Sequence, residues 1–184
     1  MGPKFLPGGG QPDIDPVSPK RISFPSSYQV GSIIIDHGGR QLFVVESATT
    51  ALRYPIAVGR EGFNWAGSEK ISRVADWPDW HPPEEMRQRD PGLPEKMGGG
   101  IRNPLGAKAL YLGNTLYRIH GTNDAKSIGS ASSSGCFRML NGHVVDLAGR
   151  IGVGTTVTVV RRLPPELERA VADQVGSGRR YGRS

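Results

Sequence analysis

Short apolar segments, each followed by turn residues, set the hydrophobic pattern of this chain. Segments 32–36, 41–45 and 52–58 are rich in Ile, Val, Leu and Phe, and each has the length of a single strand. Few residues separate them: a His-Gly-Gly turn at 37–39 and a polar turn at 47–50. Because strands joined by such short turns pair antiparallel, the pattern predicts a three-stranded antiparallel meander.

The same pattern returns further along the chain. Additional short strands are predicted at 71–74, 107–112, 116–119 and 153–160. Long helical periodicity is scarce, and 26 Gly and 15 Pro interrupt the chain. The sequence therefore predicts a mainly β domain with one or two short helices.

The helices are predicted near the end of the chain. Asn141 is a suitable N-cap for a helix that runs through Leu147 and is closed by Gly149. Residues 163–184 are predicted to form a second short helix that ends at Gly176, followed by a basic, disordered tail. The apolar face of this second helix holds Leu167, Ala170, Val171 and Val175.

Two long segments have no such periodicity. Residues 1–30 are rich in Pro and Gly and are predicted to be a linker or extended arm that could pair with a sheet edge. Residues 59–106 hold all three tryptophans, Trp65, Trp77 and Trp80. Aromatic residues are scarce in disordered segments, and long ordered loops usually serve a site. We therefore expect this Trp/Pro-rich loop to cover a groove.

Composition narrows the range of partners. The formal net charge of +6 suits an anionic surface such as cell-wall polymer, acidic lipid or nucleic acid. Nucleic acid is disfavoured, because the sequence has no aromatic-basic RNA motif, zinc-finger spacing or basic helix. No stretch approaches the roughly 20 apolar residues of a membrane-spanning helix. No signal peptide is visible, since the N-terminus has no apolar core segment.

The only cysteine, Cys136, and His120 are the first candidates for chemistry. A lone cysteine is either a small buried hydrophobic residue or a nucleophile. The sequence Ser-Ser-Ser-Gly before Cys136 makes a poor apolar wall but offers backbone N–H groups. If Cys136 begins the short helix, the helix N-terminal field should lower its thiol pKa.

His120 ends a predicted strand beside Gly121, where it is either a base or a structural histidine. Arg138 lies two residues after Cys136, so on a strand the two would share a face. There it could orient an anionic substrate or steady an oxyanion, or it could simply be solvated. Four histidines and one cysteine show no metal-ligand spacing, so no metal site is expected.

Taken together, these residues resemble a known family. The elements are His-Gly-Thr at 120–122, a Ser/Gly-bearing loop, Ser-x-Gly-Cys-x-Arg-Met at 133–139, and Asn141. Asn-Pro-Leu-Gly at 103–106, the Trp/Pro stretch at 77–83 and Val-Gly-Thr at 153–155 add support. The pattern resembles the YkuD-type (ErfK-related) L,D-transpeptidase domain over residues 31–162.

The resemblance implies an antiparallel, β-sandwich-like catalytic domain with the Trp/Pro-rich loop over the active site. It makes Cys136 the nucleophile and His120 the proton acceptor and donor, with the Gly121 carbonyl orienting the histidine ring. Supporting roles in orienting groups or stabilising the oxyanion fall to Ser134, Gly135 and Arg138. The substrate groove is expected to include Trp77, Trp80 and Ser133.

One position departs from the family pattern. Ser134 stands where the family often has a second histidine, and its hydroxyl can donate a hydrogen bond but carries no charge near neutral pH. Activity is still expected, whereas the pH profile and acceptor preference are left open.

By resemblance, the chain would cross-link peptidoglycan stem peptides. The Cys136 thiolate would attack a tetrapeptide donor at diaminopimelate, release D-Ala and pass the acyl group to a diaminopimelate acceptor, giving a 3→3 cross-link. Carbapenem β-lactams are expected inhibitors, no cofactor is implied, and a periplasmic or cell-envelope location is expected. The alternatives are a non-catalytic peptidoglycan-binding module, an enzyme that attaches an envelope protein to diaminopimelate, and a cysteine hydrolase of another substrate.

Overall fold

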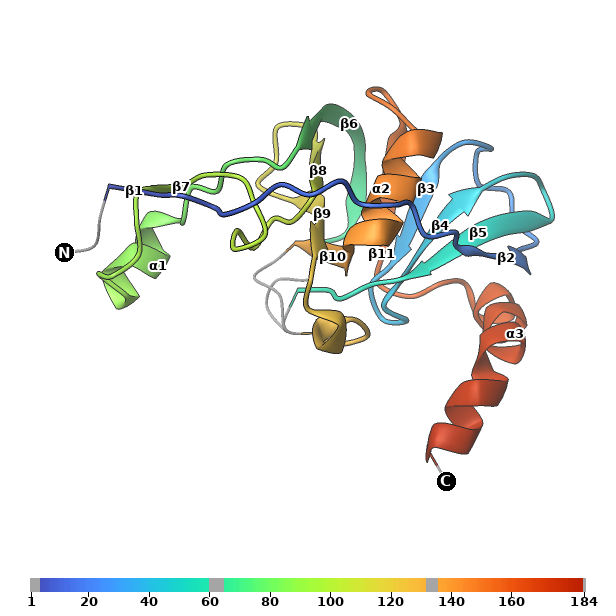
Figure 1. Ribbon diagram of the computed structural model, residues 1–184. Helices are drawn as coiled ribbons and strands as arrows, with labels where there is room; N and C mark the ends of the chain where they lie inside the picture. Colours follow the sequence, from blue (N-terminus) through green and yellow to red (C-terminus); the bar gives the residue numbers. More distant parts are fainter. Residues whose placement is uncertain (1–3, 60–64, 132–135, 184) are drawn as a thin grey trace.

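A computed structural model describes residues 4–59, 65–131 and 136–183, with side chains as far as Val175 (Figure 1). The strands in this part of the chain are β1 (Phe5–Leu6), β2 (Lys20–Ser23), β3 (Ile33–Asp36), β4 (Gln41–Val45), β5 (Thr50–Pro55), β6 (Gly67–Asp76), β7 (Lys96–Met97), β8 (Lys108–Leu112), β9 (Arg118–Thr122), β10 (Phe137–Leu140) and β11 (Thr156–Val160). The helices are α1 (Glu84–Arg89), the 3₁₀ turn η1 (Ala125–Ser127), α2 (Asn141–Arg150) and α3 (Pro165–Arg183).

One large sheet runs through the molecule in the strand order β10-β9-β8-β6-β11-β3-β4-β5-β2. The long strand β6 joins its two parts, because it pairs with β11 through residues 67–70 and with β8 through residues 71–76. We call β10, β9, β8 and the second part of β6 half-sheet I. The first part of β6 with β11, β3, β4, β5 and β2 is half-sheet II.

The predicted meander is confirmed, since β3, β4 and β5 pair antiparallel in sequence order. The mainly β, sandwich-like fold is confirmed, but its sheet is mixed and not purely antiparallel, because β9 pairs parallel with β10 and β3 pairs parallel with β11. Each parallel pair joins strands that a long connection separates, and period-two patterning does not encode strand direction. The fold is therefore mainly β, with a mixed sheet.

The main core lies between the two half-sheets and α2, as the sandwich-like expectation requires. Alternate residues of β3 and β4 enter it from half-sheet II, and Leu110, Ile119 and Phe137 enter it from half-sheet I. Val144 and Leu147 of α2 close it. All of these side chains are buried, so this cluster is the main hydrophobic stabilisation of the fold.

Helix α3 covers the other face of half-sheet II. Leu167 and Val171 pack there against Ile34 and Phe43, which confirms the predicted apolar face of the helix. The prediction that Gly176 ends the helix is wrong, because α3 continues to Arg183. A glycine inside a helix costs only about 1 kcal/mol relative to alanine, so it weakens a helix without stopping it.

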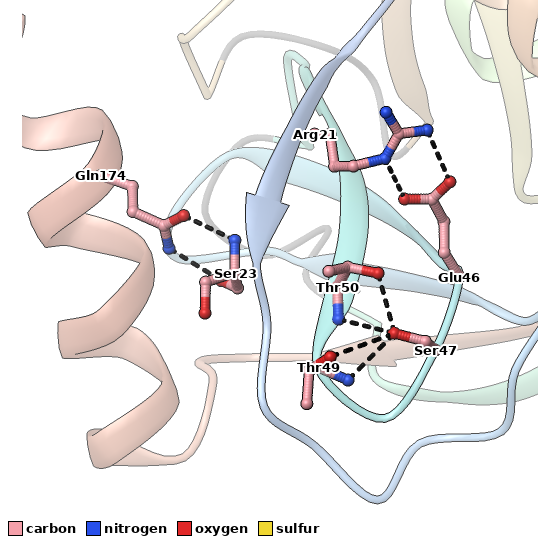
Figure 2. A network of polar contacts seen from close by, with 7 residues as sticks. All are labelled: Arg21, Ser23, Glu46, Ser47, Thr49, Thr50 and Gln174. Atoms are coloured by element: carbon pink, nitrogen blue, oxygen red, sulfur yellow. Dashed lines mark hydrogen bonds and ion pairs between the residues drawn. The ribbon is translucent and has the colours of Figure 1, made fainter.

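The N-terminal arm supplies the edge strand β2, which pairs antiparallel with β5. Figure 2 shows how its free edge is covered: the Ser23 N–H donates to Gln174 Oε1 (2.6 Å), and Gln174 Nε2 donates to the Ser23 carbonyl (2.7 Å). Arg21 also forms an ion pair with Glu46. The side-chain amide of Gln174 thus takes the place of another strand's peptide group at this edge.

The Trp/Pro-rich segment is ordered by backbone and amide contacts. Strand β1 of the arm pairs with β7, and Trp80 forms a bridge with Met97. The buried Asn103 Nδ2 donates to the carbonyls of Pro78 (3.0 Å), Met97 (3.2 Å) and Gly98 (3.0 Å). Among the helices that the structure describes, none is long and apolar enough to cross a membrane.

Candidate active site

The parallel pair β9–β10 brings the two candidate reactive residues onto neighbouring segments, with His120 in β9 and Cys136 just before β10. In its register Ile119 lies opposite Phe137, and His120 lies opposite Arg138. Ile119 and Phe137 enter the core, so His120 and Arg138 point from the opposite, outer face. Cys136 immediately precedes β10, and its thiol is hydrogen-bonded to the backbone of Arg118 on β9.

A hydrogen bond to the Gly121 carbonyl orients the ring of His120. Its Nδ1 lies 2.8 Å from the Gly121 carbonyl oxygen, so the contact expected from the sequence is present. A carbonyl oxygen only accepts, so Nδ1 carries the proton and Nε2 is left as a proton acceptor. The ring is 4% exposed. Burial, together with the Arg138 and Arg118 charges, lowers the pKa of His120 to about 4, although the Gly121 hydrogen bond opposes this.

The prediction that a helix terminus lowers the Cys136 pKa is wrong. Cys136 precedes a strand, and α2 begins only at Asn141. Burial instead raises the pKa of the Cys136 thiol, while Arg118 and Arg138 partly oppose this effect. The resting pair is therefore a neutral thiol and a neutral imidazole.

Close packing of α2 on β9 explains why glycine follows His120. A Cβ at Gly121 would lie 2.2 Å from Asn141 Oδ1 and 2.9 Å from a methyl group of Val144. The Asn141 Oδ1 accepts a hydrogen bond from the Ala107 N–H (2.9 Å). The prediction that Asn141 is the N-cap is wrong, because Leu140 holds that position. The Asn141 side chain bonds instead to the backbone of Ala107, just before β8.

The C-terminal end of the Trp/Pro-rich segment lies beside Gly121. The Trp77 N–H donates to the Ala107 carbonyl (2.7 Å). Gly106, with a φ of +69°, approaches Gly121 so closely that a Cβ there would be 2.5 Å from its carbonyl carbon. Trp80 pairs with Met97 inside the segment. Ser133, Ser134 and Gly135 lie outside the described residues.

Sequence reasoning missed Arg118, which it treated as part of an apolar strand. The guanidinium Cζ of Arg118 lies 5.0 Å from the centroid of the Tyr111 ring on β8. The alternation of Arg118, Ile119 and His120 was the available signal, since it places both polar residues on one face of a strand.

Within the described ranges, no group of three or more His, Cys, Asp or Glu side chains could hold a metal ion.

Comparisons with known proteins agree with this geometry. A family model of the L,D-transpeptidase catalytic domain, YkuD, matches residues 31–159. The "Probable L,D-transpeptidase YbiS" of Escherichia coli (strain K12) is 33% identical over 165 residues, which are 85% of this chain and 52% of that protein. The chain therefore spans about half the length of the curated relatives it matches first.

Two solved structures extend the comparison. One, described as a probable carnitine operon oxidoreductase caia from Brucella melitensis, is 45% identical with a TM-score of 0.53 and covers 80% of this chain and 96% of that one. The other is the catalytic domain of an L,D-transpeptidase from E. faecium acylated by ertapenem. It is 17% identical with a TM-score of 0.55, covers 73% of this chain and all of that one, and shows the shared fold. The chain belongs to the YkuD family of L,D-transpeptidase catalytic domains.

Proposed function

We propose that this protein is a cysteine acyltransferase that remodels peptidoglycan by forming 3→3 cross-links between stem peptides. The observation that carries the proposal is the His120 ring: its Nδ1 is held by the Gly121 carbonyl, which leaves Nε2 to serve a thiol on the same outer face. Family membership supports the same chemistry. We place the catalytic domain at residues 31–162, with 1–30 as an arm and 163–184 as a helical extension.

The first half-reaction transfers the donor acyl group to sulfur. As the Cys136 sulfur attacks the diaminopimelate carbonyl of a tetrapeptide donor, the thiol proton passes to His120 Nε2. A C–S bond forms, and the carbonyl becomes a tetrahedral oxyanion. The oxyanion then collapses and breaks the C–N bond, and His120 returns its proton to the departing amine of D-Ala. The products are a thioester on Cys136 and free D-Ala.

The second half-reaction reverses these roles. The side-chain amine of an acceptor diaminopimelate attacks the thioester, and His120 accepts a proton from that amine. The C–S bond breaks, and the proton moves from His120 to the leaving sulfur. Because the low pKa of His120 makes its protonated form a strong acid, proton return to either leaving group is favourable.

Charge stabilisation of the oxyanion is assigned to groups around the sulfur. Arg138 lies opposite His120 in the β9–β10 register, and we propose that its cation stabilises the oxyanion together with the Gly135 and Cys136 N–H groups. Ser134 would add one neutral hydrogen bond. The substrate groove is proposed to include Ser133, Trp77 and Trp80, since Trp77 is anchored beside the site through Ala107.

Partners and location follow from the same proposal. Carbapenem β-lactams should acylate Cys136, as ertapenem has acylated the E. faecium domain. The net charge of +6 favours residence on the anionic cell envelope. The acceptor could also be an envelope protein, which the same thioester would attach to diaminopimelate.

Muropeptide analysis tests the function. Purified diaminopimelate-containing peptidoglycan is incubated with the protein or with Cys136→Ala, digested with a muramidase and separated by mass. We expect 3→3 linked dimers and free D-Ala with the protein alone, and neither with the variant. Release of D-Ala without dimers would show a hydrolase. Unchanged muropeptides with folded protein would contradict the enzyme and favour a binding module.

A further inference from the structure

A row of cations lies on the outer face of half-sheet I, next to the candidate nucleophile. In the strand register Tyr111 of β8 lies opposite Arg73 of β6 on one side and Arg118 of β9 on the other. Both guanidinium Cζ atoms lie 5.0 Å from the centroid of the Tyr111 ring. Each arginine is thus held by a cation–π contact, and the aromatic ring spaces the two charges apart.

In the part of the chain that the structure describes, neither arginine has an acidic partner. No ion pair joins Arg73 or Arg118 to a carboxylate among the residues that the structure describes, whereas Lys108 at the start of β8 is paired with Asp76. The Arg118 Nε is buried and, within the same residues, has no hydrogen-bond partner. A buried donor without an acceptor is costly, and a cation contact with a ring face leaves the in-plane N–H groups of a guanidinium available.

Arg118 is also next to the reacting atom. Its backbone is hydrogen-bonded to the Cys136 thiol, and Arg118 immediately precedes the Ile119–Phe137 pair of the β9–β10 register. In an extended peptide, successive residues rise about 3.3–3.6 Å. The terminal carboxylate of the donor is one residue beyond the carbonyl that Cys136 attacks, so it is the donor carboxylate nearest along the chain to the reacting carbonyl.

We propose that Arg118, supported by Tyr111 and Arg73, binds a carboxylate of the donor stem, and that this is the terminal carboxylate of the leaving D-Ala. The inference rests on the proposed function and names the group by which the site selects its donor. A planar guanidinium matches a carboxylate through two parallel N–H···O bonds. Release of D-Ala removes the anion, which frees this side of the thioester for the acceptor amine.

Donor analogues test the proposal. Three tetrapeptide donors are compared: the free acid, the C-terminal amide, and a donor amidated at the side-chain carboxylate of diaminopimelate. D-Ala or D-alaninamide release gives kcat and KM for the protein, for Arg118→Met and Arg118→Lys, and for Arg161→Met. Arg161 is an exposed arginine at the far end of β11, so its replacement matches the charge removed without touching the site.

We expect C-terminal amidation of the donor to lower kcat/KM of the unchanged protein about 10- to 100-fold. A loss of this size corresponds to the free energy of a hydrogen bond to a charged group. Arg118→Met should lower kcat/KM for the free acid by a similar factor. For the amide, which already lacks the carboxylate, it should cause little further loss. Arg118→Lys should restore part of the discrimination, and Arg161→Met should behave like the unchanged protein. Because any effect of Arg118 on the thiol applies to all donors alike, the difference between donors isolates the carboxylate contact.

Other results would limit or overturn the proposed carboxylate site. If the Arg118-dependent loss follows amidation of diaminopimelate instead, the site binds a donor carboxylate but not that of the leaving residue. Equal use of all three donors, or an equal loss with all three in Arg118→Met, would overturn the carboxylate site while leaving the proposed enzyme intact. If no donor releases D-Ala, the proposed function itself fails. Carbapenem labelling of Cys136 in each variant confirms that the site is folded.

Discussion

The two half-sheets share one strand and one core, yet they differ on their outer faces. In half-sheet II, β3 and β4 are buried on both sides, with Ile33 and Ile35 in the main core and Ile34 and Phe43 beneath α3. In half-sheet I, Ile119 enters the core while His120 points from the other face. That outer face carries arginines, a tyrosine and the cysteine where half-sheet II carries a helix.

This difference separates stability from chemistry. Half-sheet II buries apolar side chains on both faces, so substitutions there should mainly change the free energy of unfolding. Half-sheet I uses one face for the core and keeps the other for polar groups, so substitutions there should change rates more than stability. The rigid β6 strand ties the reactive face to the stable half, which keeps the geometry of the site fixed.

Replacement of His120 should have the largest effect. We expect His120→Ala to slow acylation of Cys136 by a carbapenem about 10²–10⁴-fold, or about 3–5 kcal/mol of barrier, because the proton acceptor is removed. Stopped-flow or mass-resolved acylation kinetics measure this rate. His81→Ala, which replaces an exposed histidine of the Trp/Pro-rich segment, is the matched control. A loss of less than about threefold in His120→Ala would show that His120 is not the base.

The pH dependence of the acylation rate tests the protonation state of His120. His120 accepts a proton only when neutral, and burial holds its pKa at about 4. The acylation rate should therefore fall only as pH drops through about 4 and stay level from about pH 5.5 to about pH 8. The raised pKa of Cys136 keeps the thiol protonated over that range. An inflection near 6.5, the ordinary value for histidine, would contradict the buried neutral ring.

Phe43→Ala tests half-sheet II. Phe43 is fully buried under α3, so we expect a loss of about 3–5 kcal/mol in the free energy of unfolding from the lost contacts and the cavity. Urea denaturation measures the loss, and the acylation rate per folded molecule should change little. Phe5→Ala removes the same atoms from an exposed site and should cost far less. A large fall in the acylation rate of folded Phe43→Ala would mean that the two half-sheets are not separable.

The contrast also explains what the sequence could predict. The meander of β3, β4 and β5 could be predicted because short turns and apolar runs are local signals in the sequence. The motif around His120 and Cys136 was readable as a family pattern. The relative direction of β9 and β10 could not be predicted, because a long loop separates them. Side chains alternate with the same period in parallel and antiparallel strands.

Two misreadings have a common physical cause. Asn141 looked like a helix cap, but its amide is committed to Ala107 on a distant segment. Arg118 was counted within an apolar strand and given no role, but its partner Tyr111 lies on the neighbouring strand. In both cases a tertiary contact decides the role of a residue, and local propensity does not encode such contacts.

Asn141→Ala should have an intermediate effect. It removes the acceptor of the buried Ala107 N–H, so we expect a loss of about 1–3 kcal/mol in the free energy of unfolding. Because Asn141 also packs against Gly121, which holds the His120 ring, acylation should slow as well. Denaturation and acylation kinetics on one sample measure both. Asn114→Ala, in an exposed turn, is the control, and equal values for the two variants would refute the structural role of Asn141.

Gln174→Ala should have the smallest effect. It uncovers the free edge of β2 at Ser23 (Figure 2), and we expect a loss of about 1 kcal/mol because the contact is solvent-accessible. Hydrogen exchange should show a less protected Ser23 amide, with the acylation rate unchanged. Gln88→Ala on the exposed face of α1 changes the same side chain without an edge to uncover. Undiminished protection of Ser23 would show that Gln174 does not cover the edge.

Intact-mass measurement after incubation with a carbapenem such as ertapenem tests the central claim most directly. The account predicts one adduct per chain, located at Cys136 by peptide mapping, much slower formation in His120→Ala, and no adduct in Cys136→Ala. A folded protein that gains no adduct, or an adduct that persists in Cys136→Ala, would contradict the assignment of the outer face of β9 and β10 as the acyl-transfer site.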